Sequence, residues 1–371
     1  MVIEGIMTGN SRKKVAVGLS GGVDSSVSAA LLQEKGYDVF GITMEIFDES
    51  LPIQEAEKHA CYGPGEREDS AAAEAVCKKL GIPFHVLDLR SEYRNHVIEH
   101  FRNEYLEGKT PNPCVICNRD LKFGFLLEKA KNSGVDFDTF ATGHYARIEE
   151  SGGRFLLKKA IDPLKDQSYF LYALSPGQLS RILLPLGNLT KQQVRKIART
   201  IGLHTADRPE SQDFISGGNY AMLFDKNEAI EGDIVDDNGN VLGKHRGIIH
   251  YTIGQRRGLG IAFGRPLYVS KIDAANNRIV VSNKEKLFSR GLIASNLNLL
   301  AINKLDRPYH ASVKIRLNHP AVAATVYPFE KANAKILFDE PQEAVCPGQH
   351  AVFYMEDTVL GGGVIQQAIW L

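Results

Sequence analysis

The sequence has no excess of charge of either sign, no long apolar run and few cysteines. Its 371 residues contain 44 Lys plus Arg and 44 Asp plus Glu, so the overall charge does not indicate a polyanionic partner. No apolar stretch approaches the length of a membrane-spanning helix, and residues 1–14 lack the apolar core and cleavage site of a secretory signal. We therefore expect a cytoplasmic protein without a membrane partner, in which any nucleic-acid surface is local.

The five cysteines are an odd number spread over a long chain. Without a secretory signal, this usage favours reduced thiols, redox chemistry or metal ligation over a disulfide framework. Cys114 and Cys117 form a C-x-x-C, and Cys61 lies in a glycine-rich stretch. For Cys77, on a predicted helix, and Cys346, in the strand-like run 344–346, we expect the role of a small buried apolar side chain.

The length exceeds that of one hydrophobic core, so two or three domains are expected. In the first two hundred residues, short apolar strands alternate with amphipathic helices, which is typical of an α/β, doubly wound parallel sheet. Strands are expected at 15–19, 39–44, 84–87 and 139–142, and helices at 23–35, 67–80, 92–106, 121–132 and 190–201.

The pattern changes after Gly202, where short β-prone runs follow one another. They lie at 247–253, 267–272, 278–282, 312–316, 323–326, 335–338, 351–354 and 363–368. The sequence therefore predicts a catalytic domain at 1–216, a small β-rich central domain at 217–289 and a C-terminal β-barrel at 290–371.

The first predicted strand runs directly into a glycine-serine loop and then into a helix. The loop reads SGGVDS at residues 20–25. Paired glycines let backbone amides approach an anion, and the serine hydroxyls and the helix N-terminus add donors. The order differs from that of a Walker loop and from the G-x-G-x-x-G fingerprint. The pattern predicts a phosphate-binding loop, although a tight strand-to-helix turn has a similar composition.

The loop resembles the pyrophosphate loop (PP-loop) of the ATP pyrophosphatases, which cleave ATP into AMP and pyrophosphate. Later segments resemble successive signatures of the bacterial tRNA-specific 2-thiouridylases. These are TPNPCVICN at 110–118, ATGHY at 141–145, KDQSYFL at 165–171, YTIGQRRGLG at 251–260, and the glycines and glutamine of 347–363. The resemblance covers nearly the whole chain in the family's order, and it implies a PP-loop catalytic domain followed by a tRNA-binding barrel.

The resemblance also implies an activity, the ATP-dependent 2-thiolation of the wobble uridine of tRNA through an adenylated uridine, with release of AMP and pyrophosphate. Asp24 is expected to organise Mg²⁺ on the pyrophosphate, to cap the following helix, or both. The residues implied in ATP binding are Gly18, Leu19, Ser20, Gly21, Gly22, Val23, Asp24, Ser25, Met44 and Gly143.

Contacts with tRNA are also implied by the resemblance. Basic clusters at 191–199, 244–246, 256–257 and 314–316 fit phosphate binding, but ordinary solvated surfaces look the same. An unpaired anticodon-loop base is readily flipped into a pocket. The residues implied in contacting tRNA or the target base are Asn112, Pro113, Cys114, His144, Lys165, Asp166, Gln167, Arg316, Leu317 and Gln349. The sulfur donor, whether a carrier protein or free sulfide, is left open.

One part of the family pattern is missing. The usual member carries a second, persulfide-bearing cysteine near the end of the first domain, where this chain reads RPESQDFISGG at 208–218. Cys117 matches the family's nucleophilic cysteine. We hypothesise that Cys61, Cys114 and Cys117 hold a [4Fe-4S] cluster whose fourth iron binds the transferred sulfide. A structural zinc with His59, a Cys114–Cys117 redox pair, and Cys61 as a displaced relay cysteine remain open.

Two other functions fit parts of the sequence. A ligase of the same superfamily would adenylate an oxygen and admit nitrogen, but it would need neither Cys114 nor Cys117, and no glutaminase domain is recognisable. An RNA-binding protein with a vestigial nucleotide site would not need the intact loop at 20–25. Both observations favour the thiolase.

Overall fold

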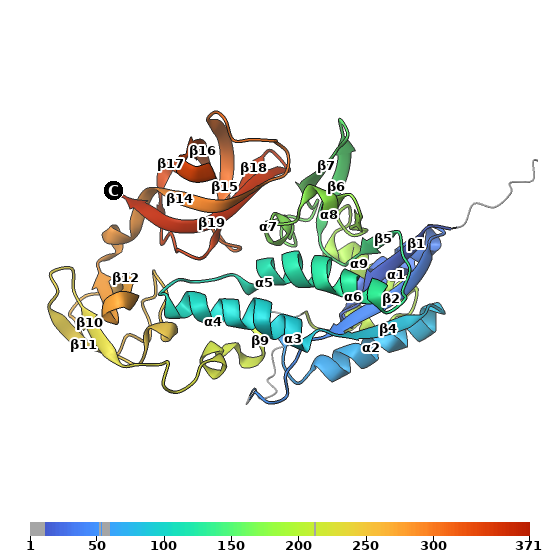
Figure 1. Ribbon diagram of the computed structural model, residues 1–371, viewed down its shortest axis with the longest axis horizontal. Helices are drawn as coiled ribbons and strands as arrows, with labels where there is room; N and C mark the ends of the chain where they lie inside the picture. Colours follow the sequence, from blue (N-terminus) through green and yellow to red (C-terminus); the bar gives the residue numbers. More distant parts are fainter. Residues whose placement is uncertain (1–11, 52, 54–59, 211–212) are drawn as a thin grey trace, which may run out of the picture.

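The computed structural model of the chain describes residues 12–51, 53, 60–210 and 213–371. The N-terminal part is built on a five-stranded parallel sheet in the order β4-β2-β1-β5-β8 (Figure 1). Its strands are β1 (Lys14–Gly18), β2 (Asp38–Glu45), β4 (Phe84–Asp88), β5 (Thr139–Ala141) and β8 (Ile182–Leu183). The four strands predicted here from apolar runs are confirmed.

Helices cover both faces of this sheet because alternate residues of each strand face opposite sides. Val15 and Val17 of β1 pack with Ala29 of α1 (Val23–Glu34) and Ala73 of α2 (Glu66–Leu80). Ala16, between the two valines, belongs to a separate core that includes residues of the helical stretch 90–106. The fold is therefore the predicted doubly wound α/β domain.

The stretch 90–132 contains π-helical segments that the sequence did not predict. Its first part runs through α3 (Arg90–Tyr93), a π-helix (Arg94–Ile98) and α4 (Glu99–Leu106). Its second part begins earlier than predicted, with α5 (Pro113–Ile116), a π-helix (Cys117–Phe125) and α6 (Leu126–Asn132). Pro113 takes the first helical position, where its missing N–H is not needed.

Further, mostly shorter elements lie between and after the strands of this sheet. They are β3 (Ala60–Tyr62), β6 (Ala146–Ser151), β7 (Arg154–Lys159), α7 (Ser168–Leu171), α8 (Pro176–Leu179), α9 (Lys191–Thr200), the 3-10 turns His204–Asp207, Ser216–Gly218 and Tyr220–Leu223, and β9 (Asp213–Ile215). Thr190 caps α9 as predicted, in a reciprocal pair of hydrogen bonds with Gln193. β3 and β9 pair in parallel although they lie about 150 residues apart in sequence.

The central part is a four-stranded sheet in the order β11-β10-β13-β12. Its strands are β10 (Gly232–Val235), β11 (Val241–His245), β12 (Tyr268–Asp273) and β13 (Arg278–Ser282). The strand predicted at 247–253 is wrong, because Ile248–His250 forms a 3-10 turn. Gly247 has φ +112°, which interrupts the extended backbone, and the adjacent Ile248 and Ile249 are both buried instead of alternating.

The C-terminal part is a closed six-stranded barrel, orange to red in Figure 1, at the far end of the molecule from β1. It contains β14 (Phe288–Leu299), β15 (Tyr309–Lys314), β16 (Val322–Phe329), β17 (Asn333–Glu343), β18 (His350–Met355) and β19 (Thr358–Trp370). Pairing of β14 with β19 closes the sheet, so the predicted barrel is confirmed. In the described part of the chain, no helix has the length and apolar character needed to cross a membrane.

Cys77 and Cys346 are both buried, as expected for small apolar side chains. Cys77 lies on α2, but the strand predicted at 344–346 is wrong, because these residues lie between β17 and β18. Ala344 has φ +55°, which breaks the extended conformation at that point.

Candidate active site

A pocket of about 350 Å³ lies at the carboxyl ends of β1 and β5. These neighbouring strands are the point at which the strand order of the sheet reverses. Doubly wound sheets bind ligands at this reversal, because the connections there leave toward opposite faces. Gly18, at the end of β1, and Thr142, just after β5, both line the pocket.

The phosphate loop forms one wall of this pocket. Gly22 caps α1 without any side-chain hydrogen bond, so the first backbone amides of the helix remain available to an anion. Within the loop, the Ser20 amide donates to Ser25 Oγ at 3.2 Å. Gly21 has φ +69°, and a Cβ there would collide with the Asp69 carbonyl. The loop therefore has the backbone geometry that the sequence predicted.

Gly143 brings the end of β5 against the start of α1. A Cβ at Gly143 would lie 2.7 Å from the Asp24 carbonyl carbon and from the Ser25 amide. Real side chains do not tolerate such distances, so this approach requires glycine. Of the residues predicted to bind ATP, all except Gly21 line the pocket, including Met44.

Asp24 is held in an ion-pair network that the sequence did not predict. Lys191 Nζ lies 2.7 and 2.8 Å from the two Asp24 carboxylate oxygens, and the Tyr145 hydroxyl donates to Asp24 Oδ1 at 2.7 Å. Lys191 also contacts Glu210 at 2.8 Å, and Lys165 contacts Glu210 at 2.6 Å. Burial opposes ionisation of Glu210, but hydrogen bonds from the two lysines lower its pKa to about 2.

Lys191 and Arg208 show which site residues sequence reasoning missed. Lys191 belongs to the basic cluster that was considered for RNA binding, yet its side chain is buried and reaches inward. Arg208 lines the pocket, where its guanidinium donates to the Gly21 carbonyl at 2.8 Å and to Asp69 at 3.0 Å. The only local signal in the sequence was that Lys191 belongs to a basic cluster. The acidic residues that pair with Lys191 and Arg208 lie far from them along the chain.

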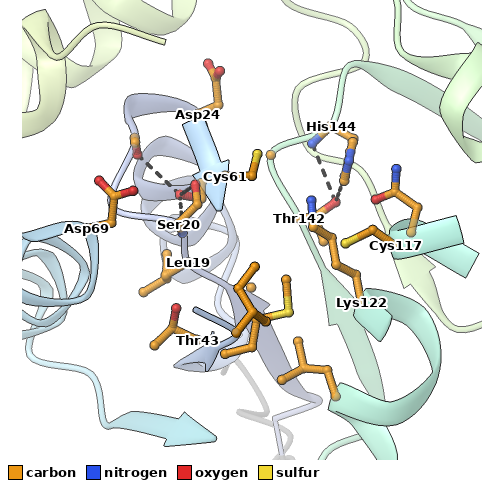
Figure 2. A pocket seen from close by; sticks show the side chains of 18 of the residues that line it. Leu19, Ser20, Asp24, Thr43, Cys61, Asp69, Cys117, Lys122, Thr142 and His144 are labelled. Atoms are coloured by element: carbon orange, nitrogen blue, oxygen red, sulfur yellow. Dashed lines mark hydrogen bonds between the residues drawn. The ribbon is translucent and has the colours of Figure 1, made fainter. Parts of the chain in front are cut away.

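Three cysteines line the same pocket as the phosphate loop. Cys61 comes from β3, Cys114 from α5 and Cys117 from the first position of the π-helix. Figure 2 shows Ser20 on one side of the pocket and Cys117 on the other, with Cys61 between them in this view. One cavity thus presents both a phosphate loop and thiols.

The surroundings of Cys117 disfavour its thiolate. Burial raises the pKa of Cys117 to about 11, and the neighbouring Cys61 and Asp120 also raise it. Lys122 acts in the opposite direction and lowers it. Because the thiolate is the nucleophile, sulfur chemistry at neutral pH requires additional stabilisation of the anion.

The described residues do not fit a metal centre. Among them, no three His, Cys, Asp or Glu side chains converge closely enough to hold an ion, although Cys61, Cys114 and Cys117 share one pocket. His59, the candidate fourth zinc ligand, lies outside the described residues, as do Ser211 and Gln212. The Asp24 carboxylate is already engaged by Lys191 and Tyr145. The iron–sulfur and magnesium hypotheses therefore stay predictions that this geometry does not support.

His144 lines the pocket beside the cysteines. Its Nδ1 forms a 2.8 Å hydrogen bond with Thr142 Oγ1. Burial, together with the nearby Lys122 charge, lowers the pKa of His144 to about 3. The side chain is neutral at physiological pH, so any contact with RNA would be a neutral hydrogen bond and not an ion pair.

The other residues predicted to contact tRNA are dispersed. Pro113 and Gln167 line the pocket, whereas Asn112 precedes α5 as its cap residue. Lys165 is paired with Glu210, and Asp166 accepts hydrogen bonds from the Ala160 amide and from Ser168. In this conformation the Lys165 and Asp166 side chains are therefore engaged within the protein.

Arg316, Leu317 and Gln349 lie in the C-terminal part and do not line the pocket. Gln349 Nε2 donates to the Thr110 carbonyl at 2.9 Å and to the Pro111 carbonyl at 3.2 Å. The Thr110 amide donates in return to the Pro347 carbonyl at 2.8 Å. These bonds fasten the barrel to the segment that leads into Cys114.

Models of known protein families match successive segments along nearly the whole chain. Residues 13–216 match the model of a "tRNA methyl transferase HUP domain", residues 222–283 that of a "tRNA methyl transferase PRC-barrel domain", and residues 289–365 that of an "Aminomethyltransferase beta-barrel domain". A solved "4-thiouridine synthetase - RNA complex with bound ATP" is 16% identical, and the match covers 55% of this chain and 46% of that one with a TM-score of 0.36.

Curated relatives are much more similar. The tRNA-specific 2-thiouridylase MnmA of Acetivibrio thermocellus is 46% identical over 96% of this chain and 100% of its own length. The protein of the same name from Clostridium perfringens is 44% identical over 97% of this chain and 100% of its own. With this identity over essentially full length, the chain belongs to the tRNA-specific 2-thiouridylase family.

Proposed function

We propose that the protein replaces the 2-oxygen of the wobble uridine of tRNA with sulfur in an ATP-dependent reaction. The observation that carries this proposal is the single pocket in which a phosphate loop faces three cysteines. The name of the curated relatives supports the same reaction. An enzyme that only bound RNA, or that admitted nitrogen, would not need thiols at this place.

The chemistry explains why both halves of the pocket are required. The uridine 2-oxygen attacks the α-phosphate of ATP, and pyrophosphate leaves toward the amides at the start of α1. Sulfur then attacks carbon 2 of the adenylated base, the C–O bond breaks, and AMP leaves.

For the sulfur step, we assign the nucleophilic role to Cys117 and the entry of sulfur to Cys61. Cys61 is exposed at the pocket, whereas Cys117 is half-buried in its wall. β3 pairs with β9 so that Ala60 lies opposite Asp213 and Tyr62 opposite Ile215. Cys61 therefore lies beside the 213–215 segment, in the region where the family pattern has its second cysteine. A cysteine on β3 can thus substitute for one that is missing from β9.

This assignment gives a balanced reaction. A persulfide on Cys61 attacks carbon 2 through its terminal sulfur, which leaves a disulfide between that sulfur and Cys61 after AMP departs. The Cys117 thiolate then attacks Cys61 Sγ, which forms a Cys61–Cys117 disulfide and leaves sulfur on the base. Hydrosulfide then attacks Cys61 Sγ of this disulfide, which restores the Cys61 persulfide and releases the Cys117 thiol, so the cycle starts from the disulfide form of the protein and needs no further oxidant.

We assign tRNA binding to the pocket mouth and the barrel. The target uridine would be flipped toward Pro113, Cys114 and Gln167, which line the pocket. Release of Lys165 from Glu210 would free it for phosphate, and Arg316 would contact the RNA from the barrel.

The direct test is anaerobic incubation of the pure protein with ATP, sulfide and unmodified tRNA, followed by nucleoside mass analysis of the digested RNA. We expect 2-thiouridine, and AMP and pyrophosphate in equal amounts with it. The description of the matching domain model names a tRNA methyl transferase. If the protein formed a methylated uridine from a methyl donor and no thiolated product, the proposal would be contradicted.

The assignment of Cys61 predicts that Cys61→Ser loses thiolation but retains tRNA-dependent release of pyrophosphate, because the phosphate loop is untouched. Cys346→Ala removes a buried thiol outside the pocket and serves as the matched control. Nucleoside mass analysis measures thiolation, and pyrophosphate release measures adenylation. Iron and sulfide analysis of anaerobic wild-type protein distinguishes the Cys61 persulfide relay from the [4Fe-4S] cluster, because roughly four irons per chain would favour the cluster. A fully active Cys61→Ser variant would exclude both.

A further inference from the structure

Lys122 is a charged side chain on the pocket wall that the steps proposed so far do not use. It is half-buried and lines the pocket beside Cys117. Among the residues that the structure describes, no carboxylate lies within ion-pair distance of Lys122, whereas the other two lysines near the pocket, Lys165 and Lys191, are paired with Glu210. Withdrawing an ammonium from water is unfavourable unless a counter-charge compensates it. The pocket itself should therefore supply an anion.

The π-helix determines where this charge lies. Its backbone hydrogen bonds join residues five apart, and Cys117 and Lys122 have this separation at the start of the segment. In an α-helix, two residues five apart would be rotated by about 140° from each other, and only one of them would face the pocket. In the observed helix both line it, and Figure 2 shows the two side chains on the same side of the pocket.

The groups around Lys122 are sulfur atoms. Burial alone would lower the pKa of Lys122, but Cys117, Cys61 and Cys114 raise it above its ordinary value. The neutral His144 also lies near Lys122, and the buried phenol of Tyr93 lies near the same three cysteines. Asp120 lies on the same π-helix as Cys117, but both of its carboxylate oxygens accept hydrogen bonds from Arg119. Sulfur is therefore the natural site of the compensating negative charge.

We propose that Lys122 is a positioning residue whose ammonium holds negative charge on the sulfur of Cys117 and on the sulfur species delivered to this pocket. The inference rests on the proposed thiolation, in which Lys122 is one contributor to the stabilisation of the anionic nucleophile. When Cys117 ionises, its proton passes to water and the ammonium stays protonated. Because the incoming sulfur is also anionic, as hydrosulfide or as a persulfide anion, the same charge attracts it into the cavity.

The test compares Lys122→Met and Lys122→Gln, which remove the charge, with Lys122→Arg, which retains it. Lys131→Met removes an exposed charge from α6 and is the matched control. The full-length proteins, without ATP or tRNA, are alkylated with iodoacetamide between pH 6 and 10, and modification of each cysteine is followed by mass spectrometry. Circular dichroism confirms that each variant is folded.

We expect the charge-removing variants to shift the alkylation profile of Cys117 to higher pH and to slow its reaction at pH 8 by about tenfold, which corresponds to one pKa unit of thiolate population. For Lys122→Arg and Lys131→Met, the rate of Cys117 alkylation at pH 8 should stay within about threefold of wild type, which corresponds to half a pKa unit. An unchanged profile in folded Lys122→Met or Lys122→Gln would overturn the proposal, as would a Lys122→Arg variant as slow as Lys122→Met. The assay involves no RNA, so its outcome is independent of whether the protein thiolates tRNA.

Discussion

Replacement of Cys117 by serine is expected to abolish 2-thiouridine formation while tRNA-dependent release of pyrophosphate continues. A hydroxyl at this position cannot attack Cys61 sulfur or carry sulfur, whereas the adenylation half of the pocket keeps all of its groups. Loss of a nucleophile typically lowers turnover by at least about 10⁴-fold. Nucleoside mass analysis measures thiolation, and pyrophosphate release measures adenylation in the same reaction.

Cys77→Ala is the matched control for this variant, because Cys77 is buried on α2 away from the pocket. It removes one thiol and should change thiolation little in the fraction that remains folded. If Cys117→Ser still produced 2-thiouridine at an appreciable rate, the nucleophile would have to be Cys114 or Cys61.

Replacement of Asp24 by alanine is expected to reduce AMP formation by on the order of 10²- to 10³-fold, the usual range for losing one preorganised charged contact. The carboxylate anchors Lys191 at the start of α1, next to the amides that receive pyrophosphate. Without Asp24 the Lys191 ammonium is drawn toward Glu210, and the electrostatic arrangement around the phosphates changes. Thiolation should fall in parallel, because adenylation precedes it.

A loss of stability must be distinguished from this effect, since breaking a largely buried ion pair is destabilising. Tyr145→Phe removes one hydrogen bond to the same carboxylate and leaves the Lys191 pair intact. Thermal unfolding of both variants measures the loss of stability. AMP release at a temperature where both variants are folded measures the loss of activity. Wild-type AMP release by folded Asp24→Ala would show that the loop carboxylate is dispensable.

The sequence predicted those parts of the site that are encoded locally. Strand β1, the glycine-serine loop and α1 are adjacent along the chain, and their order alone indicates a phosphate loop. The same is true of α9, whose cap Thr190 is visible three residues before its partner Gln193. In such segments, the residues that determine the geometry are within one turn of each other.

The parts that could not be predicted depend on distant partners or on an uncommon helix type. The pairing of Asp24 with Lys191 joins residues 167 positions apart, and no local pattern marks it. β3 is only three residues long and exists through its pairing with β9. The π-helix that aligns Lys122 with Cys117 has the composition of an ordinary helix, so the sequence indicated an α-helix that begins at residue 121 and leaves Cys117 outside it.

The hydrogen bonds from Gln349 to Thr110 and Pro111 couple the C-terminal barrel to the catalytic domain, so the two do not behave as independent modules. Gly348 packs so tightly on Thr110 that a Cβ there would approach its backbone to 3.0 Å. An RNA that pushes or tilts the barrel would therefore move the segment that leads into α5, and with it the sulfur-bearing wall of the cavity. Grafting the barrel of one relative onto the catalytic domain of another would place this junction under mechanical strain, and a hybrid enzyme would need to carry residues 109–111 and 347–349 from the same parent.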